Sequence, residues 1–316
     1  MEVIRGIHNV RARHHGCVVT IGNFDGVHRG HQMLLQHLIE RAQDHKVPSV
    51  LITFEPQPRE FFRGESVPAR LTRFREKVTL LRDTGLDRVL CLPFNESLAS
   101  IKPRRLLEDL LVERLGVKYV VVGDDFRFGR NAGGDFSMIE AAAEELGFEA
   151  QRMSTLNAAD ERISSSRIRQ LLGEGKLDEA AVLLGHSYFI MGRVVYGRQL
   201  GRQLGTPTAN IKLQRYHSAI RGVFAVEVES EREGLRLNGV ANIGVRPTVE
   251  GQEPLLEVHL FDWSGNLYGD LLTVKFVEKL REEQKFESLE ALKEQIAIDI
   301  EMSKSVLEQT NTRGEV

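Results

Sequence analysis

The chain has 316 residues, of which 41% are hydrophobic and 28% are charged, and its formal net charge is −3. The length predicts two domains or one large one, and the composition is that of a globular protein and excludes a wholly disordered chain. The slight acidity argues against a general nucleic-acid binder. The two cysteines are too few for a disulfide framework or a thiolate zinc site, so a reducing cytoplasm fits best. The charged N-terminus lacks the apolar segment of a signal peptide, and no apolar run approaches the roughly 20 residues of a membrane-spanning helix.

The first half of the chain alternates between strand-like and helix-like segments. The pattern predicts strands at residues 17–21, 49–54, 88–92, 119–122 and 148–153, and helices at 30–42, 74–83, 104–115 and 136–146. Strands that alternate with helices form βαβ units and a parallel sheet, whose ligands bind beyond the carboxyl ends of the strands. We therefore expect an open α/β domain.

The second half has a different pattern. Residues 165–185 indicate two short helices broken at Gly173 and Gly175. Short alternating segments follow, and Gly, Pro and Asn separate them; an amphipathic helix comes last. These strands are expected at 189–196, 222–229, 236–243, 255–261 and 271–280, and the helix at 288–307. This predicts a small antiparallel sheet or barrel with a C-terminal helix, and a boundary that divides the chain into domains 1–185 and 186–316.

The sharpest motif, GNFDGVHRGH at residues 22–31, follows the first strand and opens the first helix. At a helix start, His28 and His31 are three residues apart and share one face, where free N–H groups and the helix dipole favour a phosphate. Gly26 and Gly30 allow close approach of the backbone. This arrangement suits attack on a nucleotide α-phosphate, where charge develops on the non-bridging oxygens. The alternative is two surface histidines in a chain that has ten.

The H-x-G-H spacing resembles the signature of the nucleotidylyltransferase superfamily. The longer string TIGNFDGVHRGH is similar to the N-terminal module of bifunctional riboflavin kinase/FAD synthetases. The resemblance implies that His28 and His31 stabilise charge on the α-phosphate of ATP. It also assigns the loop residues to ATP and phosphate binding: Gly22, Asn23, Phe24, Asp25, Gly26 and Gly30.

A second stretch, ISSSRIR at 163–169, opens another expected helix. It resembles the superfamily signature I-S-S-T-x-I-R, with Ser166 where Thr is common. The resemblance implies phosphate binding by Ser164, Ser165, Ser166 and Arg169. The alternative is an ordinary helix N-cap with exposed arginines.

Two further stretches carry weaker signals. VGDDFRFG at 122–129 resembles a nucleotide-binding stretch of the family and assigns that role to Asp125, although Ala132 stands where the family often has Arg. Its alternative is a strand-end turn with two buried aromatic rings. TFEPQP at 53–58, with Phe54 and Phe62, is expected from the family to border the flavin; the alternative is a Pro-rich turn over a Phe-rich core patch.

The second half contains the Gly-rich basic segment GRQLGRQLGTPTAN at 197–210. Glycines such as Gly201 and Gly205 expose N–H groups that can cradle phosphates, and Thr208 and Asn210 offer neutral oxygens suited to Mg²⁺ that ATP phosphates already hold. Neither a G-x-x-x-x-G-K-[ST] nor a strand-linked G-x-G-x-x-G occurs, which excludes a Walker-type kinase and a dinucleotide-binding fingerprint. The alternative is a solvated hairpin connection.

The string GRxLGxPTAN resembles the riboflavin kinase signature, and NIGVRPT, EVHLFD and LYGD match the same family downstream. The resemblance implies that Glu257 is the base that takes the proton from the riboflavin 5′-hydroxyl and that Arg281 lies near the flavin. Two alternatives stay open. Alternation puts Glu257 and His259 on one polar face that solvent could cover, and Arg281 could be an exposed residue at a strand end.

The resemblance as a whole implies an α/β nucleotidylyltransferase domain followed by a riboflavin kinase barrel. The expected reactions convert riboflavin and ATP to FMN, then FMN and a second ATP to FAD and pyrophosphate, with Mg²⁺ accompanying ATP. No nucleic-acid or membrane partner is expected, and the oligomeric state stays open. Two competing hypotheses are a nucleotidylyltransferase with a degenerate barrel and a non-enzymatic flavin sensor or carrier. The intact PTAN and Glu257 argue against the first, and both histidines argue against the second.

Overall fold

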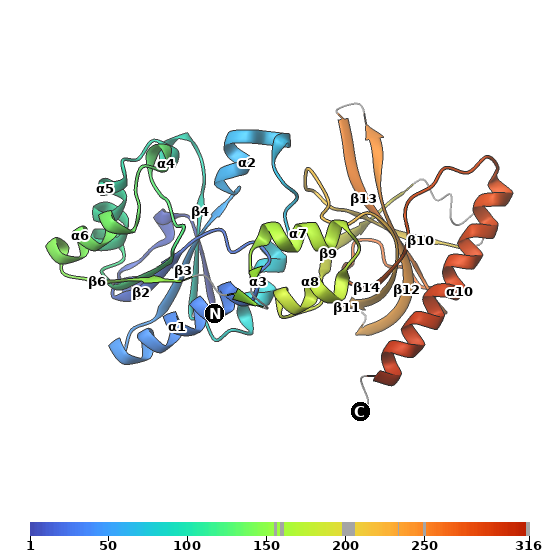
Figure 1. Cartoon of the computed structure of the whole chain (residues 1–316), viewed down its shortest axis with the longest axis horizontal. Helices are drawn as coiled ribbons and strands as arrows, with labels where there is room; N and C mark the ends of the chain where they lie inside the picture. The colour runs from blue at the N-terminus through green and yellow to red at the C-terminus, as the bar shows by residue number, and fades with distance from the viewer. Residues whose placement is uncertain (155–156, 159–160, 198–205, 233, 249–250, 314–316) are drawn as a thin grey trace. The chain divides into compact units, whose positions relative to one another are not determined.

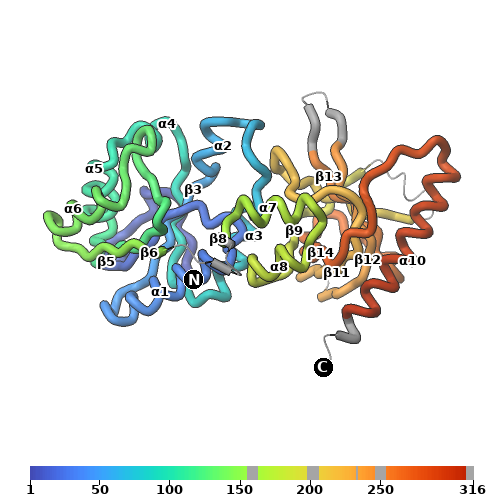
Figure 2. The backbone as a smooth tube through the Cα atoms, viewed as in Figure 1, coloured from blue at the N-terminus to red at the C-terminus, as the bar shows by residue number. Residues whose placement is uncertain are grey.

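A computed structural model describes residues 1–154, 157–158, 161–197, 206–232, 234–248 and 251–313 (Figures 1 and 2). The chain forms two compact units. Unit 1 comprises Met1–Val67 and Thr72–Ser164, and unit 2 comprises Pro68–Leu71 and Ser165–Val316. The division therefore falls earlier than the expected boundary at 185/186, because the helices of 165–185 pack with the following barrel.

Unit 1 contains a six-stranded, wholly parallel sheet, as the alternating pattern predicted. Its spatial order is β1-β4-β3-β2-β5-β6. Strands β3 and β4 are added on one side of β2 and strands β5 and β6 on the other, so the strand order reverses between β2 and β5. The strands are β1 (Glu2–Arg5), β2 (Cys17–Ile21), β3 (Ser49–Glu55), β4 (Arg88–Pro93), β5 (Val117–Gly123) and β6 (Glu149–Met153). No strand was expected at β1, which is a four-residue edge strand with a single buried side chain.

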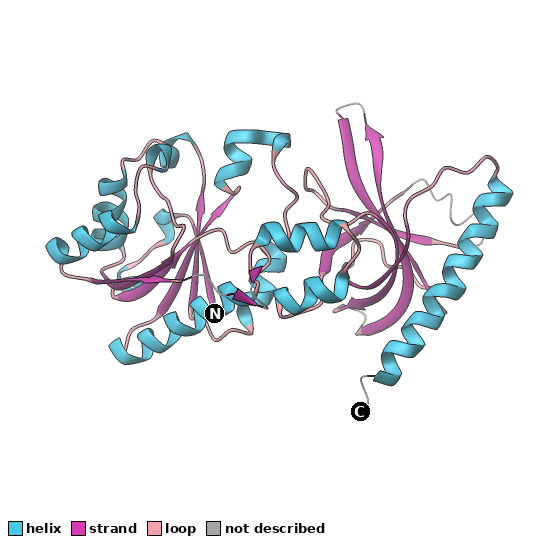
Figure 3. Cartoon of the chain, viewed as in Figure 1, coloured by secondary structure: helices cyan, strands magenta, loops and turns pink. Residues whose placement is uncertain are grey.

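Helices cover both faces of the sheet (Figure 3). Successive residues of a strand point to opposite faces, so they pack against different helices. One face, with Val18 and Leu51, packs against α1 (Arg29–His45) and α3 (Phe74–Arg82). The other, with Val19 and Ile52, packs against a π-helical stretch at Leu106–Arg114 and α6 (Phe136–Leu146). The described part of the unit also contains the short α-helices α2 (Pro58–Arg63), α4 (Glu96–Ala99) and α5 (Pro103–Arg105), besides several 3-10 turns. A two-stranded ribbon pairs β7 (Asn157–Ala158) with β8 (Glu161–Arg162).

Unit 2 is built around a closed six-stranded barrel in which every strand pairs antiparallel with its neighbours. The order is β10-β13-β12-β11-β14-β9. The strands are β9 (Phe189–Val195), β10 (Thr208–Lys212), β11 (Gly222–Ser230), β12 (Leu235–Thr248), β13 (Gly251–Leu260) and β14 (Leu271–Arg281). Strand β10 was expected as part of a loop, but pairing with both β9 and β13 holds it extended.

Three helices pack on the barrel. Helices α7 (Ser165–Gly173) and α8 (Leu177–Leu184) add Leu171, Leu172 and Leu184 to the core that the barrel encloses. Helix α10 (Leu289–Arg313) covers part of the outer surface, where Val223, Val240 and Leu307 form a smaller apolar cluster. Within the described part of the chain, no helix is both long and apolar enough to cross a membrane.

Candidate active sites

The H-x-G-H loop lies at the carboxyl edge of the unit 1 sheet, where the strand order reverses. The loop leaves β2 at Gly22, whose N–H donates to the Ile52 carbonyl at 3.0 Å, and ends at His28, the N-cap of α1. Asp125 lies in an exposed turn just beyond the end of β5, which is the other strand at the reversal. In open α/β sheets, this crevice is the position at which ligands bind.

The two histidines of this motif are stacked on each other. Their ring centroids are 3.6 Å apart at an interplanar angle of 18°, and Phe24 stacks on the other side of His31 at 4.6 Å. The Nδ1 atom of His28 accepts a hydrogen bond from the His31 N–H at 3.4 Å. His28 is buried, which excludes the alternative of two ordinary surface histidines.

His31 has an environment that favours its neutral form. The pKa of His31 lies well below its usual value of 6.5, chiefly because burial disfavours the charged ring, and further because His28 and Lys77 add positive charge nearby. Its Nδ1 atom is enclosed and has no hydrogen-bond partner among the described residues. A neutral imidazole keeps one N–H to donate, so His31 can still contact a phosphoryl oxygen.

The glycines of the loop have separate structural tasks. Gly26 has φ +86°, a left-handed conformation that favours glycine. A Cβ at Gly30 would lie 3.3 Å from the His28 ring, and one at Gly22 would lie 3.0 Å from the Phe24 ring. Gly30 therefore makes room for His28, in addition to any approach of the backbone to a phosphate.

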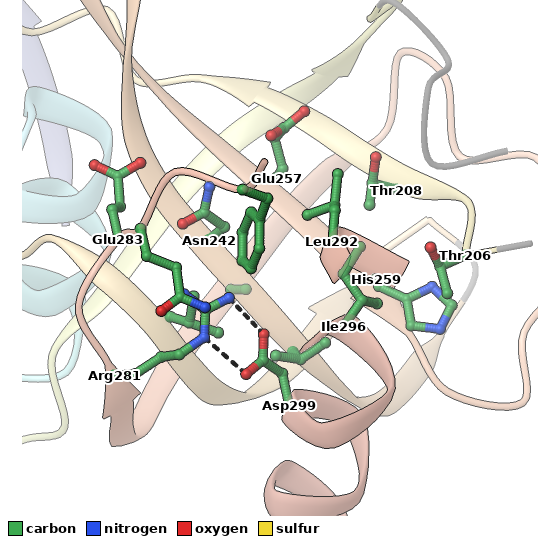
Figure 4. Close-up of a pocket in the computed structure, with 15 residues that line it drawn as sticks. Thr206, Thr208, Asn242, Glu257, His259, Arg281, Glu283, Leu292, Ile296 and Asp299 are labelled. Carbon is green, nitrogen blue, oxygen red and sulfur yellow. Dashed lines mark hydrogen bonds and ion pairs between the residues drawn. The ribbon is translucent and has the colours of Figure 1, made fainter. Parts of the chain in front are cut away.

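Unit 2 holds a cavity of about 300 Å³ between the outer surface of the barrel and α10 (Figure 4). Strands β10 to β14, the segment after β14 and α10 all contribute to it. The lining residues are Thr206, Thr208, Val223, Val240, Ala241, Asn242, Glu257, His259, Arg281, Glu283, Gln284, Phe286, Leu292, Ile296 and Asp299. The cavity is thus lined by three residues that the sequence analysis assigned to the kinase site: Thr208, Glu257 and Arg281.

Strand register places Glu257 between two asparagines. Glu257 pairs with Asn210 on β10 and with Asn242 on β12, so all three side chains share one face of the sheet. The predicted polar face of Glu257 and His259 is therefore correct. That face, however, lines the cavity, so the alternative of a simple solvent-facing strand residue loses its support.

Pro207 and the first residues of β10 have defined hydrogen-bond contacts. His259 Nδ1 and the Pro207 carbonyl are 2.9 Å apart, which ties β13 to the residue before Thr208. The Asn210 amide donates to the Thr208 carbonyl at 3.3 Å. A Cβ at Gly197 would lie 2.4 Å from the end of the Asn210 side chain, which would have to move to admit any other residue there. Gly201 and Gly205 lie outside the described residues.

Arg281 is held by α10. Its guanidinium donates twice to Asp299, at 2.8 and 2.7 Å, and once to the Glu282 carbonyl at 3.0 Å. Arg281 also lies over the ring of Phe286, 5.8 Å from its centroid. Figure 4 shows this ion pair at one end of the cavity, with Glu257 and Thr208 at the other. The alternative of a free, exposed arginine at a strand end is therefore wrong.

Comparisons with known proteins match the two halves of the chain separately. The FAD synthetase family matches residues 10–167, and the riboflavin kinase family matches residues 184–307. A bifunctional riboflavin kinase/FMN adenylyltransferase from Pseudomonas fluorescens is 48% identical over 307 residues, which cover 97% of this chain and 98% of that protein. The chain belongs to this family.

Other relatives agree in length and fold. A protein of the same name from Escherichia coli K12 is 49% identical over 300 residues, covering 95% of this chain and 96% of that protein. A crystal structure described as a macrolide-efflux protein from Streptococcus pneumoniae has a TM-score of 0.80 at 27% identity, covering 96% of this chain and 99% of that one. The α/β and barrel architecture expected from the riboflavin kinase/FAD synthetase resemblance is thus confirmed.

The remaining residues predicted from the family resemblance have mixed environments. Phe62 is 66% exposed, and its ring packs edge-on against Phe94, so the alternative of a core patch is wrong for it. Phe54 also packs edge-on against Phe94, with the two ring centroids 5.7 Å apart. Contact of Phe54 and Phe62 with a flavin stays a prediction, as does the nucleotide role of Asp125.

The ISSSRIR motif straddles the two compact units, because Ser164 ends unit 1 and Ser165 begins α7 of unit 2. Within unit 2, the Arg169 Nε donates to the Ala69 carbonyl at 2.5 Å, so part of its guanidinium holds the segment Pro68–Leu71 against α7. Phosphate binding by Ser164, Ser165, Ser166 and Arg169 stays a prediction.

Sequence reasoning missed Thr72, which anchors the adenylyltransferase loop. The Thr72 N–H donates to Asp25 Oδ1 at 3.0 Å, and its hydroxyl accepts from the Gly26 N–H at 2.9 Å. Asp25, predicted to bind ATP, is therefore used at least in part to join the loop to the segment before α3. Thr72 falls in no recognised motif and lies one residue before Arg73, the N-cap of α3, so no local sequence signal marked it.

Changing Thr72 to Val tests this anchor. Valine keeps the shape but cannot accept the hydrogen bond from the Gly26 N–H, and loss of this buried bond is expected to destabilise unit 1 by about 1–3 kcal/mol. Loosening the loop should slow FAD formation from supplied FMN roughly tenfold or more, since small displacements of reacting groups are costly. Thr84→Val is the matched control, because it removes a hydroxyl that bonds the Leu81 carbonyl at the other end of α3. Similar FAD rates in both variants would show that the anchor has no part in catalysis.

Proposed function

We propose that the two activities of this family occupy two separate sites, with riboflavin phosphorylated in the barrel cavity of unit 2 and FMN adenylylated at the H-x-G-H loop of unit 1. Riboflavin kinase and FMN adenylyltransferase activity follow from the family to which the chain belongs. The observation that supports the division is the cavity lined by Thr208, Glu257 and Arg281, since it holds residues assigned to the metal, the base and the flavin. FMN is the product of the first reaction and the substrate of the second.

In the kinase site, Glu257 accepts the proton of the riboflavin 5′-hydroxyl as the oxygen attacks the γ-phosphoryl group of ATP. Its position between Asn210 and Asn242 supports this role, because amide groups on both sides can orient the carboxylate. Arg281, which Asp299 holds, borders the flavin. Positioning and charge neutralisation supply most of the catalysis in such transfers.

Mg²⁺ bound to ATP is the expected cofactor of the kinase site. Among the described residues, no group of three or more His, Cys, Asp or Glu side chains could hold a metal ion. The neutral oxygens of Thr208 and Asn210 suit a cation that ATP phosphates already carry, because Mg²⁺ binds few protein ligands when phosphates and water complete its shell. An ion held by Thr208 and Asn210 would supply positive charge against the phosphates, which the Gly-rich segment before Thr208 would cradle.

In the adenylyltransferase site, the FMN phosphate attacks the α-phosphate of a second ATP, and pyrophosphate leaves. The phosphate is already ionised, so the reaction needs neither a strong base nor a covalent enzyme intermediate. His28 and His31 donate hydrogen bonds to the oxygens on which charge develops. The nucleotide phosphates are bound by Ser164–Ser166, Arg169 and Asp125. The flavin ring is bordered by Phe54 and Phe62.

The location that fits these reactions is the cytoplasm. Cys17 and Cys91 are both buried and not joined in a disulfide, and burial raises the pKa of Cys17 to about 12, which keeps this thiol protonated and inert. Buried thiols outside disulfides suit a reducing compartment. Riboflavin, FMN and ATP are the proposed small-molecule partners, and no nucleic acid or membrane is needed.

A fragment of residues 165–316 tests the division of activities. It is expected to form FMN from riboflavin and ATP but no FAD, as measured by chromatography of the flavins. A fragment of 188–316 should be less stable towards urea, because it lacks the α7 and α8 side chains that are buried in the barrel core. If fragment 165–316 folds by circular dichroism but forms no FMN, the proposed kinase site is wrong.

A further inference from the structure

Arg281 ends β14 at a β-bulge that turns its side chain towards α10. In a regular strand, successive side chains point to opposite faces of the sheet. Here Val223 pairs with Arg281 and Phe224 pairs with Lys279, so Leu280 is an extra residue in the ladder. Leu280 packs against the apolar cluster under α10, and Arg281, the next residue, reaches α10 as well. Bulges beside functional sites often redirect a side chain in this way.

The guanidinium of Arg281 is held on three sides. Asp299 accepts from its Nε and Nη2 atoms, and the Glu282 carbonyl accepts from Nη1. The ring of Phe286 lies against the group, with its centroid 5.8 Å from the guanidinium carbon. A guanidinium has five N–H donors, so two of them have no acceptor among the described residues. Because Arg281 lines the cavity, these two can donate to a ligand there.

Asp299 fixes this geometry from α10. Its side chain is 5% exposed, against 21% for Arg281. Asp299 also accepts a hydrogen bond from the Gln295 amide at 2.9 Å, one helical turn earlier. Gln295 in turn accepts from the amide of Gln284, in the segment after β14, at 3.2 Å. Arg281 and Gln284, which both line the cavity, are therefore joined through α10.

The buried position of this ion pair suggests a role other than stabilisation. Withdrawing two charges from water is costly, and the attraction between them often does no more than offset that cost. Binding cavities orient a ligand with a small number of precisely placed polar groups. The riboflavin ring presents two carbonyl oxygens, which accept hydrogen bonds. An arginine that already points at them need not be ordered when the ligand binds.

We propose that Asp299 is a positioning residue for riboflavin, which holds the Arg281 guanidinium so that its two remaining N–H groups face the carbonyl oxygens of the flavin ring. The inference rests on the proposed kinase site and on the place of Arg281 beside the flavin, and it adds the helix residue that prepares this arginine. Asp299 acts through Arg281 and not on the reacting atoms. Its loss should therefore weaken riboflavin binding far more than it slows phosphoryl transfer.

The test is the affinity of full-length Asp299→Asn for riboflavin, measured without ATP from the change in flavin fluorescence. Asn is close in size to Asp, so Arg281 keeps its charge and its surroundings but loses its charged partner. The dissociation constant should rise about two- to tenfold, which is the cost of ordering one long side chain on binding. The KM for riboflavin should rise in parallel while kcat changes less than about twofold, as expected when ground-state and transition-state binding weaken equally.

Ser303→Ala is the matched control for a merely structural role of Asp299. Ser303 is fully buried on α10 and donates to the Gly239 carbonyl at 2.9 Å, so it also ties the helix to the barrel, but it does not line the cavity. Both variants are expected to lower stability towards urea. Only Asp299→Asn should weaken riboflavin binding, and Asp299→Glu, which keeps the carboxylate, should retain more of the affinity.

The double variant of Arg281→Met with Asp299→Asn shows whether Asp299 acts through Arg281. Once the guanidinium is absent, Asp299→Asn should have no further effect on riboflavin affinity, because residues that act through one contact are not additive. The double variant also avoids the buried, unpaired carboxylate that Arg281→Met alone would leave.

The outcomes separate the inference from the role on which it rests. If Arg281→Met weakens riboflavin binding while Asp299→Asn binds like the wild type, the inference about Asp299 is wrong and the place of Arg281 stands. The inference is also wrong if the two losses add in the double variant, or if Ser303→Ala weakens binding as much as Asp299→Asn. If the double variant binds riboflavin with the wild-type constant, Arg281 does not border the flavin, and that part of the proposed function fails with the inference.

Discussion

Replacing Glu257 with Gln is expected to lower FMN formation from riboflavin by about 10²–10⁴-fold, because Gln keeps the shape of the side chain but cannot accept the hydroxyl proton. FAD formation from supplied FMN should be unchanged, since that reaction uses the H-x-G-H loop of unit 1. The measurement is a paired assay of both reactions on one preparation, with the flavins separated by chromatography.

Glu278→Gln is the matched control for this prediction. Glu278 is an exposed carboxylate on β14 that does not line the cavity, so its amide should behave like the wild type within about 0.5 kcal/mol. An equal loss of both reactions in Glu257→Gln would indicate misfolding instead of a lost base. Wild-type FMN formation would show that Glu257 is only a strand residue and that the base lies elsewhere.

Replacing His28 or His31 is expected to slow FAD formation and to leave FMN formation intact, which is the reverse of the result expected for Glu257→Gln. Removal of one donor that stabilises transition-state charge typically lowers the rate by about 10²–10³-fold, so FAD formation from FMN should fall by that factor while FMN formation persists. His31→Ala tests this directly. His28 also caps α1, so His28→Asn is the sharper variant, because Asn can keep the capping acceptor while the imidazole is lost.

His37→Ala serves as the control on the same helix. His37 lies in α1 and contacts Tyr119 and Gln151, away from the phosphate end of the helix, so its loss should leave the FAD rate unaltered. Wild-type rates in both His28→Asn and His31→Ala would remove the phosphate-contact role from the motif.

The architecture could be predicted from the sequence because its strands have strong local signals. CVVTI at β2 is buried at all five positions, and such β-branched runs mark central parallel strands. Strand β10 was missed because its five residues follow a Gly- and Pro-rich stretch, and it is extended only through pairing with β9 and β13. The C-terminal helix was predicted over 288–307 but extends to Arg313.

The candidate sites were predictable where one short motif contains the chemistry. His28 and His31 share a single loop, and Thr208 and Asn210 share a single strand. The supporting residues come from distant parts of the chain and leave no local signal. Thr72 bonds Asp25 across 47 residues, and Asp299 bonds Arg281 across 18. Only the fold brings these partners together.

Complementation between two inactive variants is the most direct test of two separate sites in one chain. Glu257→Gln and His31→Ala, each incubated alone with riboflavin, ATP and Mg²⁺, should form little or no FAD, because the first makes no FMN and the second cannot adenylylate it. Mixed together, they should form FAD, since FMN released by His31→Ala is a substrate for the intact H-x-G-H loop of Glu257→Gln. If the mixture forms no FAD while each variant retains its single remaining activity, the two reactions do not occur at independent sites linked by free FMN.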